Sequence, residues 1–259
     1  MTAIAAPIRA RRPGPRAWGM LILSEAKSLV RDYASLLLPL GLPLLVLVTS
    51  ASIASAEPIG DTGFTAFEFF VLPIVLTMVF SYIGLLNMPT YLSYYRKSGI
   101  LRRLGATPAS PVMVLVSQIV VNALLSVIGV ALAVAVAFVF FDAVAPVNAF
   151  AVVGAGLLVM VTMYSIGTVV ASLAPTTNSA IAFGIILFLG LGALGGMFGG
   201  RGALPESLQK LGQYLPFGAS SDLLSVSWTG DALEPTMIAP LLIAIAVSVS
   251  VSLVFFRWE

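Results

Sequence analysis

The 259-residue chain contains no cysteine and no histidine. Disulfides, thiol nucleophiles, zinc sites built on these residues and imidazole acid–base catalysis are therefore excluded. Charged residues are scarce, at 9% of the chain against about 25% in a typical soluble domain. Hydrophobic residues make up 59%, which is more than a water-soluble fold of this length can bury. The chain is therefore predicted to lie in a lipid bilayer.

Six apolar segments are long enough to cross the hydrocarbon core as helices, which takes about 20 residues. They cover residues 35–53, 67–88, 112–141, 150–174, 178–198 and 237–256. The fourth and fifth are separated only by Pro175 and the polar residues 176–178, a helix breaker followed by capping residues. We therefore predict an all-α polytopic membrane protein with six transmembrane helices.

The positions of Lys and Arg predict the orientation of the chain. An even number of spans places both termini on one side, together with the segments that join spans two to three and four to five. This side carries 11 of the 13 Lys and Arg residues, and only Arg201 and Lys210 lie on the other. Positive residues accumulate in cytoplasmic loops, so we expect cytoplasmic termini on a multi-pass protein of the plasma membrane. Because the charges flank apolar spans, the basic character of the chain does not indicate nucleic-acid binding.

The first 33 residues are expected to precede the six-span domain, residues 34–259, as two parts. Residues 1–14 are predicted to be a disordered cytoplasmic tail, and residues 15–33 an amphipathic helix at the cytoplasmic interface. The apolar face of this helix is predicted to carry Trp18, Ile22, Leu23, Ala26, Leu29 and Val30. A secretory signal is disfavoured, because the first apolar span starts late and no convincing cleavage site follows it.

The segment RKSGILRRLGATPASP, residues 96–111, places four positive charges between spans two and three. Apolar residues alternate there with Arg102 and Arg103, as in a short amphipathic helix. Gly105 suits the left-handed position that follows such a helix, and Pro111 suits the first turn of the next. The positive charges either anchor the span ends or form a rigid cytoplasmic helix that docks to another protein.

The stretch YYRKSGILRRLGATPASPVMVLVSQ resembles the signature of membrane permeases of the type-two ABC exporter class. This class includes bacterial drug-efflux and daunorubicin-resistance permeases, polysaccharide exporters and the eukaryotic G subfamily. The residues that fit the class pattern are Arg96, Gly99, Leu101, Leu104, Thr107, Pro108 and Ser110. The segment YLPFGASSDLL, residues 214–224, resembles the Leu-Pro segment that precedes the last span of these permeases. In order and spacing, the resemblance covers essentially the whole chain.

The resemblance implies a cytoplasmic coupling helix that sits in a groove of a separate ATP-binding subunit. The residues to which it assigns this role are Arg96, Lys97, Gly99, Leu101, Arg102, Arg103, Leu104, Gly105, Thr107 and Pro108. It further implies two copies of the ATPase subunit and a second permease subunit, as a homodimer or a heterodimer. None of the three lysines lies in the G-x-x-x-x-G-K-[S/T] loop that binds nucleotide phosphates. ATP and Mg²⁺ are thus expected on the partner ATPase, and no cofactor or metal on this chain.

Candidate substrate residues lie in spans two and three. Those expected to line the cavity are Phe70, Ile74, Thr77, Met78, Ser81, Tyr82, Gln118 and Asn122. Gln118 and Asn122 share one helix face with Ser126, and these polar groups either hold helices together or form a cavity wall. The candidates for an external gate are Glu68, Gly199 and Pro216. Glu68 either reaches the membrane interface or gates the exit, and the resemblance implies short re-entrant external helices between spans five and six.

The expected function is that of a permease subunit, not itself an enzyme, in an ATP-driven exporter. Its substrates are expected to be hydrophobic or amphipathic drugs or lipids, which suggests multidrug efflux and antibiotic resistance. A stand-alone secondary transporter or channel is the alternative, but it predicts an ionisable group near the membrane centre, and the spans contain almost none. An intramembrane enzyme is disfavoured because its usual sites require histidine.

Overall fold

The computed structural model describes residues 14–54, 57–59, 63–98 and 111–255. Within these ranges the chain is helical, apart from connecting segments and one isolated β-bridge between Pro58 and Thr65. The helices long and apolar enough to cross a membrane are Tyr33–Ala51, Phe67–Lys97, Val112–Phe140, Ala149–Leu173, Thr177–Gly195 and Pro235–Phe255. The prediction of an all-α protein with six spans is therefore confirmed, and every span except the second ends close to its predicted bounds.

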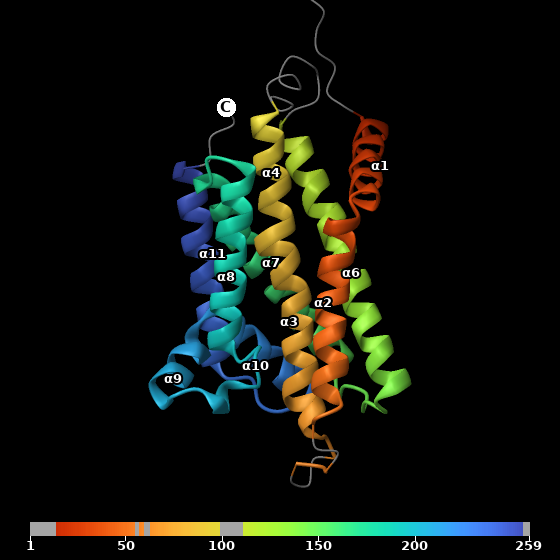
Figure 1. Cartoon of the computed structure of the whole chain (residues 1–259), viewed down its shortest axis with the longest axis vertical. Coiled ribbons are helices and arrows are strands. Elements are labelled where there is room, and N and C mark those ends of the chain that lie inside the picture. The colour runs from red at the N-terminus through yellow and green to blue at the C-terminus, as the bar shows by residue number, and fades with distance from the viewer. Residues whose placement is uncertain (1–13, 55–56, 60–62, 99–110, 256–259) are drawn as a thin grey trace, which may run out of the picture.

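The spans form an upright bundle with short helices at its two ends (Figure 1). Helix α1 (Pro15–Arg31) lies at one end, beside the last turns of α4 (Met88–Lys97) and the first turns of α6 (Pro111–Phe140). Helices α9 (Glu206–Tyr214) and α10 (Pro216–Thr229) lie at the opposite end. The other α-helices are α2 (Tyr33–Ala51), α3 (Leu72–Tyr82), α7 (Ala149–Leu173), α8 (Thr177–Gly195) and α11 (Pro235–Phe255). The predicted tail and most of the predicted coupling segment lie outside the described residues.

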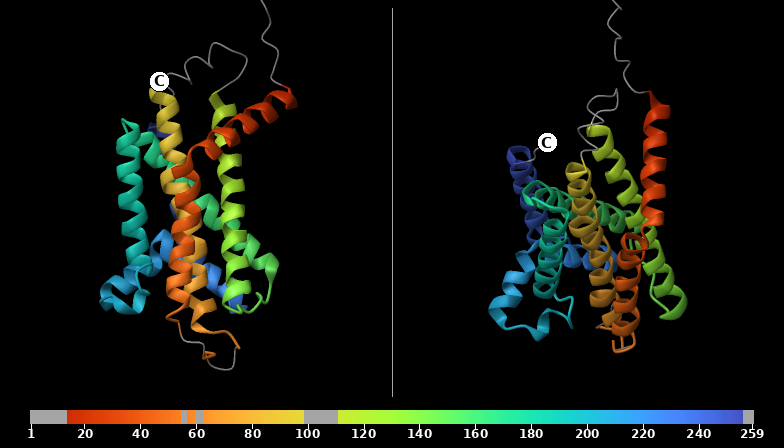
Figure 2. Two further views of the ribbon diagram at one scale, coloured as in Figure 1. Left: turned by 45° about the vertical axis from the view of Figure 1, so that its right-hand side comes forward. Right: turned by 45° about the horizontal axis from the view of Figure 1, so that its top comes forward.

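Helix α1 turns away from α2 at Asp32, as the left view of Figure 2 shows. Asp32 leaves the helical conformation, with φ −90° and ψ 86°. Its carboxylate accepts hydrogen bonds from the backbone N–H of Ser35 at 3.3 Å and from the Ser35 hydroxyl at 2.6 Å. The carboxylate thereby satisfies a backbone donor at the start of α2. We call residues 15–35 the elbow.

The second span is longer than predicted and is not a regular α-helix. It contains two π-helical segments, η1 (Phe67–Val71) and η2 (Ile83–Asn87), and it continues through α4 to Lys97. Each π-segment ends two residues before a proline, Pro73 or Pro89. Proline has no N–H for the preceding turn, which favours a local change in the hydrogen-bond ladder. The predicted end at Met88 was wrong because the helix continues past Pro89.

Helix α10 inserts into the bundle rather than lying on its surface. It packs against α3, α7, α8 and α11, and most of its residues are buried. Close approach at glycines makes this possible, since Gly195 of α8 faces Phe217 and the backbone nitrogen of Gly218. The prediction of two short helices after span five is confirmed, and the more deeply packed of them is α10.

Candidate functional site

Arg96 and Lys97 are the only predicted coupling residues within the described part of the chain, and they form the last turn of α4. The guanidinium of Arg96 donates a 3.2 Å hydrogen bond to the carbonyl of Ala171 and a second bond to the carbonyl of Ala174. These carbonyls lie at the end of α7, where a cation is favourable because the last carbonyls lack intrahelical donors. Arg96 therefore fastens the end of span two to the end of span four.

The remaining predicted coupling residues lie outside the described residues. They are Gly99, Leu101, Arg102, Arg103, Leu104, Gly105, Thr107 and Pro108. Their role stays a prediction. Helix α4 precedes this segment and helix α6 follows it. The contacts of these two helices therefore fix the two ends of the segment.

Three side chains spaced four residues apart connect span two to the elbow. The Asn87 amide donates to the carbonyl of Ser35 at 2.8 Å, and the Tyr91 hydroxyl donates to Asp32 at 3.1 Å. Tyr95, one turn further, donates to Glu25 of α1 at 2.5 Å. Residues at this spacing share one helix face, so a single face of span two contacts the elbow at three levels.

Glu25 is the most unusual member of this contact, because its carboxylate is buried with 8% of the residue exposed. It accepts hydrogen bonds from the hydroxyl of Tyr95 and from the amide of Gln118 in α6. Burial raises the pKa of the Glu25 carboxyl above its ordinary value, while these two hydrogen bonds act in the opposite direction. Three separate helices thus meet at one acidic group.

The polar stripe predicted on α6 contributes to this contact. Gln118 and Asn122 are buried, and the Asn122 amide donates to the backbone carbonyl of Gln118 at 2.9 Å. Ser126 pairs with the hydroxyl of Tyr164 in α7 at 2.9 Å. Gln118 and Ser126 thus join α6 to neighbouring helices, whereas the bonds of Asn122 stay within α6, and none of the three lines the cavity described below.

Sequence reasoning missed Glu25, and only part of the apolar face predicted for α1 packs against the other helices. Leu23 and Val30 are exposed, whereas Ile22, Ala26 and Leu29 pack against the core. Glu25 lies inside the stripe 22–25–26–29, which has the i, i+3, i+4, i+7 spacing of a buried helix face. An acidic residue in the middle of such a stripe was the available signal.

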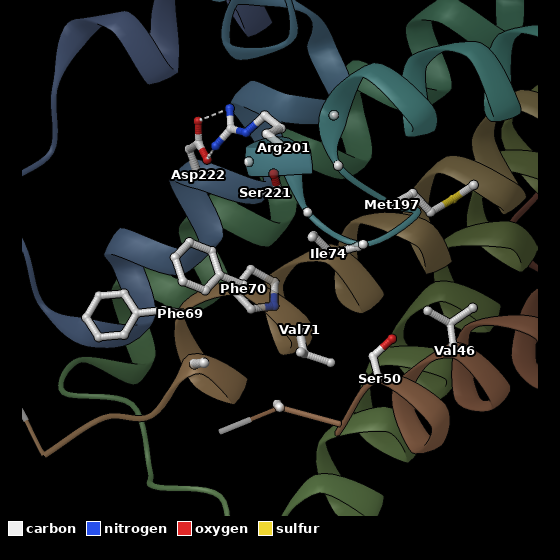
Figure 3. Close-up of a pocket in the computed structure, with 18 of the residues that line it drawn as sticks. Val46, Ser50, Phe69, Phe70, Val71, Ile74, Met197, Arg201, Ser221 and Asp222 are labelled. Carbon is white, nitrogen blue, oxygen red and sulfur yellow. Dashed lines mark hydrogen bonds and ion pairs between the residues drawn. The ribbon is translucent and has the colours of Figure 1, made fainter. Parts of the chain in front are cut away.

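A cavity with a volume of about 610 Å³ lies at the end of the bundle opposite α1. Its walls come from the end of α2, from η1 and the start of α3, from the loop after α8, and from α10. The lining is mostly apolar and includes Val46, Phe69, Phe70, Ile74 and Met197 (Figure 3). Such a volume and lining are typical of sites for hydrophobic small molecules.

One ion pair, Arg201–Asp222, lies at an edge of this cavity, across from Ser50 and Val46 (Figure 3). The Arg201 guanidinium donates two hydrogen bonds to the two carboxylate oxygens of Asp222, one of them 2.8 Å long. The side chains are 22% and 23% exposed, respectively. Arg201 follows Gly200, whose φ of 82° is a left-handed conformation that favours glycine. The loop therefore brings Arg201 back onto α10.

The structure divides the predicted cavity residues of span two into two groups. Phe70 and Ile74 line the cavity, together with the predicted gate residue Gly199. Thr77, Met78 and Ser81 are fully buried, and Tyr82 packs edge-on against Phe188 of α8. This second group lies between helices and does not line the cavity.

Glu68 and Pro216, the other two predicted gate residues, do not line the cavity either. The Glu68 carboxylate is buried and accepts hydrogen bonds from the backbone of Thr65 at 2.9 Å and of Val144 at 3.0 Å. It therefore joins the start of span two to the segment between α6 and α7. Only 2% of the residue is exposed. Pro216 occupies the first turn of α10.

The described residues contain no group of three or more His, Cys, Asp or Glu that could hold a metal ion. Six apolar spans and an elbow helix fastened to span two define a multi-pass membrane protein. More specifically, the family model for the ABC-2 type transporter matches residues 16–227, and the chain belongs to this family. The resemblance to type-two ABC permeases is thereby confirmed. No curated protein matches the chain.

Proposed function

We propose that the chain is the permease subunit of an ATP-driven exporter, powered by a separate ATPase. The observation that carries this proposal is a six-span chain of the ABC-2 type transporter family whose sequence has no phosphate-binding loop. Two ATPase subunits and a second permease subunit complete the assembly, with ATP and Mg²⁺ bound to the ATPase. The protein lies in the plasma membrane with cytoplasmic termini, in line with the distribution of Lys and Arg.

Coupling between the ATPase and the permease occurs through residues 96–108. A segment that transmits force must be held rigidly by the spans it joins. Arg96 fastens α4 to α7, and Tyr95 and Gln118 fasten α4 and α6 to α1. These contacts support the proposal because they lie where α4 and α6 meet the segment.

The cargo is a hydrophobic or amphipathic molecule, such as a drug or a lipid, that moves out of the cytoplasm. The apolar cavity supports this class of cargo, since Phe69, Phe70 and Met197 offer no hydrogen bonds to a strongly polar solute. If drugs are among the substrates, the assembly provides multidrug efflux and antibiotic resistance.

The test uses the complete permease–ATPase assembly in proteoliposomes, with ATP-dependent movement of a panel of hydrophobic fluorescent compounds as the readout. Leu101→Asp or Gly99→Asp is expected to abolish transport while the chain remains in the membrane. The matched control is Leu233→Asp, because Leu233 is exposed in the segment before α11. If both Gly99→Asp and Leu101→Asp transport as well as the parent, this result would count against the coupling role.

A further inference from the structure

The cavity between α2, η1, α3 and α10 is mostly apolar, and its polar lining residues include Ser50, Ser221 and one ion pair. Arg201 and Asp222 are the only charged residues among the described residues that line it. They neutralise each other through paired hydrogen bonds. Their side chains are largely withdrawn from water, so the charge balance of this wall depends on one contact.

An ion pair in the wall of a cavity binds some ligand head groups better than others, depending on their charge. A ligand with one net charge can bind to Arg201 or to Asp222 only by leaving the other residue unpaired. An unpaired charge in a poorly hydrated site is strongly unfavourable. A zwitterionic head avoids this cost, since its anionic group pairs with the guanidinium and its cationic group with the carboxylate. Arginine is well suited to phosphate because its planar fork donates two parallel hydrogen bonds.

The remainder of the cavity suits the apolar part of the same molecule. Phe69, Phe70 and Ile74 line the same cavity as the ion pair, and Val46 of α2 lines it too (Figure 3). A volume of about 610 Å³ accommodates a hydrocarbon chain or a ring system of drug size. The charged pair therefore lies at one edge of a mostly hydrophobic chamber.

We propose that this cavity binds an amphipathic molecule with a zwitterionic head, whose charges pair with Arg201 and Asp222. The apolar part of the ligand lies against Phe69, Phe70 and Ile74. This inference deepens the proposed function by naming a class of cargo, and it rests on that function for the step from binding to transport. Binding is measured without ATP or the ATPase, so failure of transport and failure of this site are distinguishable.

The experiment measures binding of four lipids with identical acyl chains to the purified full-length chain in detergent micelles. The probes are phosphatidylcholine (zwitterionic), phosphatidic acid (anionic), a trimethylammonium lipid (cationic) and diacylglycerol (uncharged), each competing with one fluorescent lipid. The parent protein is expected to bind phosphatidylcholine at least about tenfold more tightly than the anionic or the cationic lipid. It should also bind phosphatidylcholine more tightly than diacylglycerol, which reports the apolar contacts alone. Equal binding of all four probes would overturn the proposal.

Two variants identify the residues responsible. Asp222→Asn leaves Arg201 without its anion and should shift the preference to phosphatidic acid. Arg201→Gln leaves Asp222 and should shift it to the cationic lipid. The controls are Glu206→Gln and Lys210→Gln, because these residues form a 2.7 Å ion pair on α9 with side chains 81% and 70% exposed. A preference that does not move in Asp222→Asn or Arg201→Gln would contradict the proposal.

A third variant covers the case in which loss of one charge unfolds the protein. The swap Arg201→Asp with Asp222→Arg keeps both charges in the wall. If its thermal unfolding matches that of the parent, it is expected to retain the preference for the zwitterionic probe. A folded swap variant that binds all heads equally would also overturn the proposal.

Discussion

The hydroxyl of Tyr95 donates a 2.5 Å hydrogen bond to the carboxylate of Glu25, 70 residues earlier in the chain. This bond joins α4 to the elbow helix α1 immediately before the predicted coupling segment. Gln118 reaches the same carboxylate from α6, on the other side of that segment. If α4 and α6 move apart, at least one of the two hydrogen bonds to Glu25 must therefore break, or Glu25 must move with its partner.

Replacing Glu25 by Gln is expected to keep or increase stability at mildly alkaline pH. The Gln carbonyl can accept the hydrogen bonds of Tyr95 and Gln118, and no charge is then buried. Glu25→Ala should be less stable than the parent, because the buried Tyr95 hydroxyl loses its acceptor and the Gln118 amide keeps only its 3.3 Å bond to that hydroxyl. Thermal unfolding of the purified chain in detergent measures both. A Gln variant as unstable as the Ala variant would contradict this account.

The pH dependence of stability supplies a second test of the same residue. Burial raises the pKa of Glu25 in the folded protein, so the folded state binds the proton more tightly than the unfolded state. The stabilising contribution is complete below the ordinary carboxyl pKa and is lost as pH rises through the raised value. Melting temperatures of the parent should therefore fall relative to those of Glu25→Gln across this window. Parallel pH curves would show that burial of Glu25 has no energetic effect.

Asp32 should respond to pH in the opposite direction. Its hydrogen bond from the Ser35 hydroxyl is the main cause of a pKa below the ordinary value. Its contribution is present above the ordinary carboxyl pKa and is lost as pH falls through the lowered value. Asp32→Asn should remove this loss at acid pH. The measurement is again the melting temperature against pH, and an Asn variant with the same acid-side decline as the parent would contradict the prediction.

Arg96 has two separable roles in this account, an observed contact and a predicted one. Arg96→Gln is expected to lower the stability of the isolated chain by about 1–3 kcal/mol, because charge-assisted hydrogen bonds to the end of α7 are lost. Lys97→Gln, one residue further along and exposed, serves as the control for loss of a positive charge. If Arg96→Gln unfolds like the parent but no longer binds the ATPase, Arg96 is a docking residue and not an anchor.

Gly167 marks the closest approach between α7 and the π-segment η2. A methyl group at Gly167 would overlap the carbonyl oxygen of Gly84, whereas one at Gly154 of the same helix meets nothing within 4 Å. Gly167→Ala should therefore cost about 1–3 kcal/mol through overpacking, and Gly154→Ala should change little. Chemical or thermal unfolding of the two variants decides the matter. Equal stability of both would mean that η2 and α7 do not touch closely.

Periodicity and composition predicted the parts of this fold that depend on the bilayer. Six spans, the short helices after span five and the polar face of Gln118 and Asn122 all follow from residue spacing. The continuation of span two could not be predicted, because Pro89 and a tyrosine-rich stretch are typical of a helix end. Tyr91 and Tyr95 remain helical because Asp32 and Glu25, distant in sequence, satisfy their hydroxyl groups.

The cavity was only partly predictable for a similar reason. Phe70 and Ile74, two of the residues predicted to contact substrate, line it, and their role stays a prediction. Arg201 and Asp222 were not expected, since their pairing depends on the path of a glycine-rich loop that carries no periodic signal. The position of Glu68 at the end of a span suggests an interfacial or gating role. Its hydrogen bond from the backbone N–H of Val144 joins residues far apart in the chain, so the sequence position alone could not predict this contact.

The central claim is that this permease is driven by an ATPase on another polypeptide that contacts residues 96–108. The most direct measurement is affinity purification of the intact assembly from its native membrane, after cross-linking through a cysteine introduced at Leu101 of this cysteine-free chain. The account predicts that a nucleotide-hydrolysing subunit co-purifies and is cross-linked at this position, and that the isolated chain hydrolyses no ATP. An assembly without such a subunit, or robust ATP hydrolysis by the isolated chain, would contradict it.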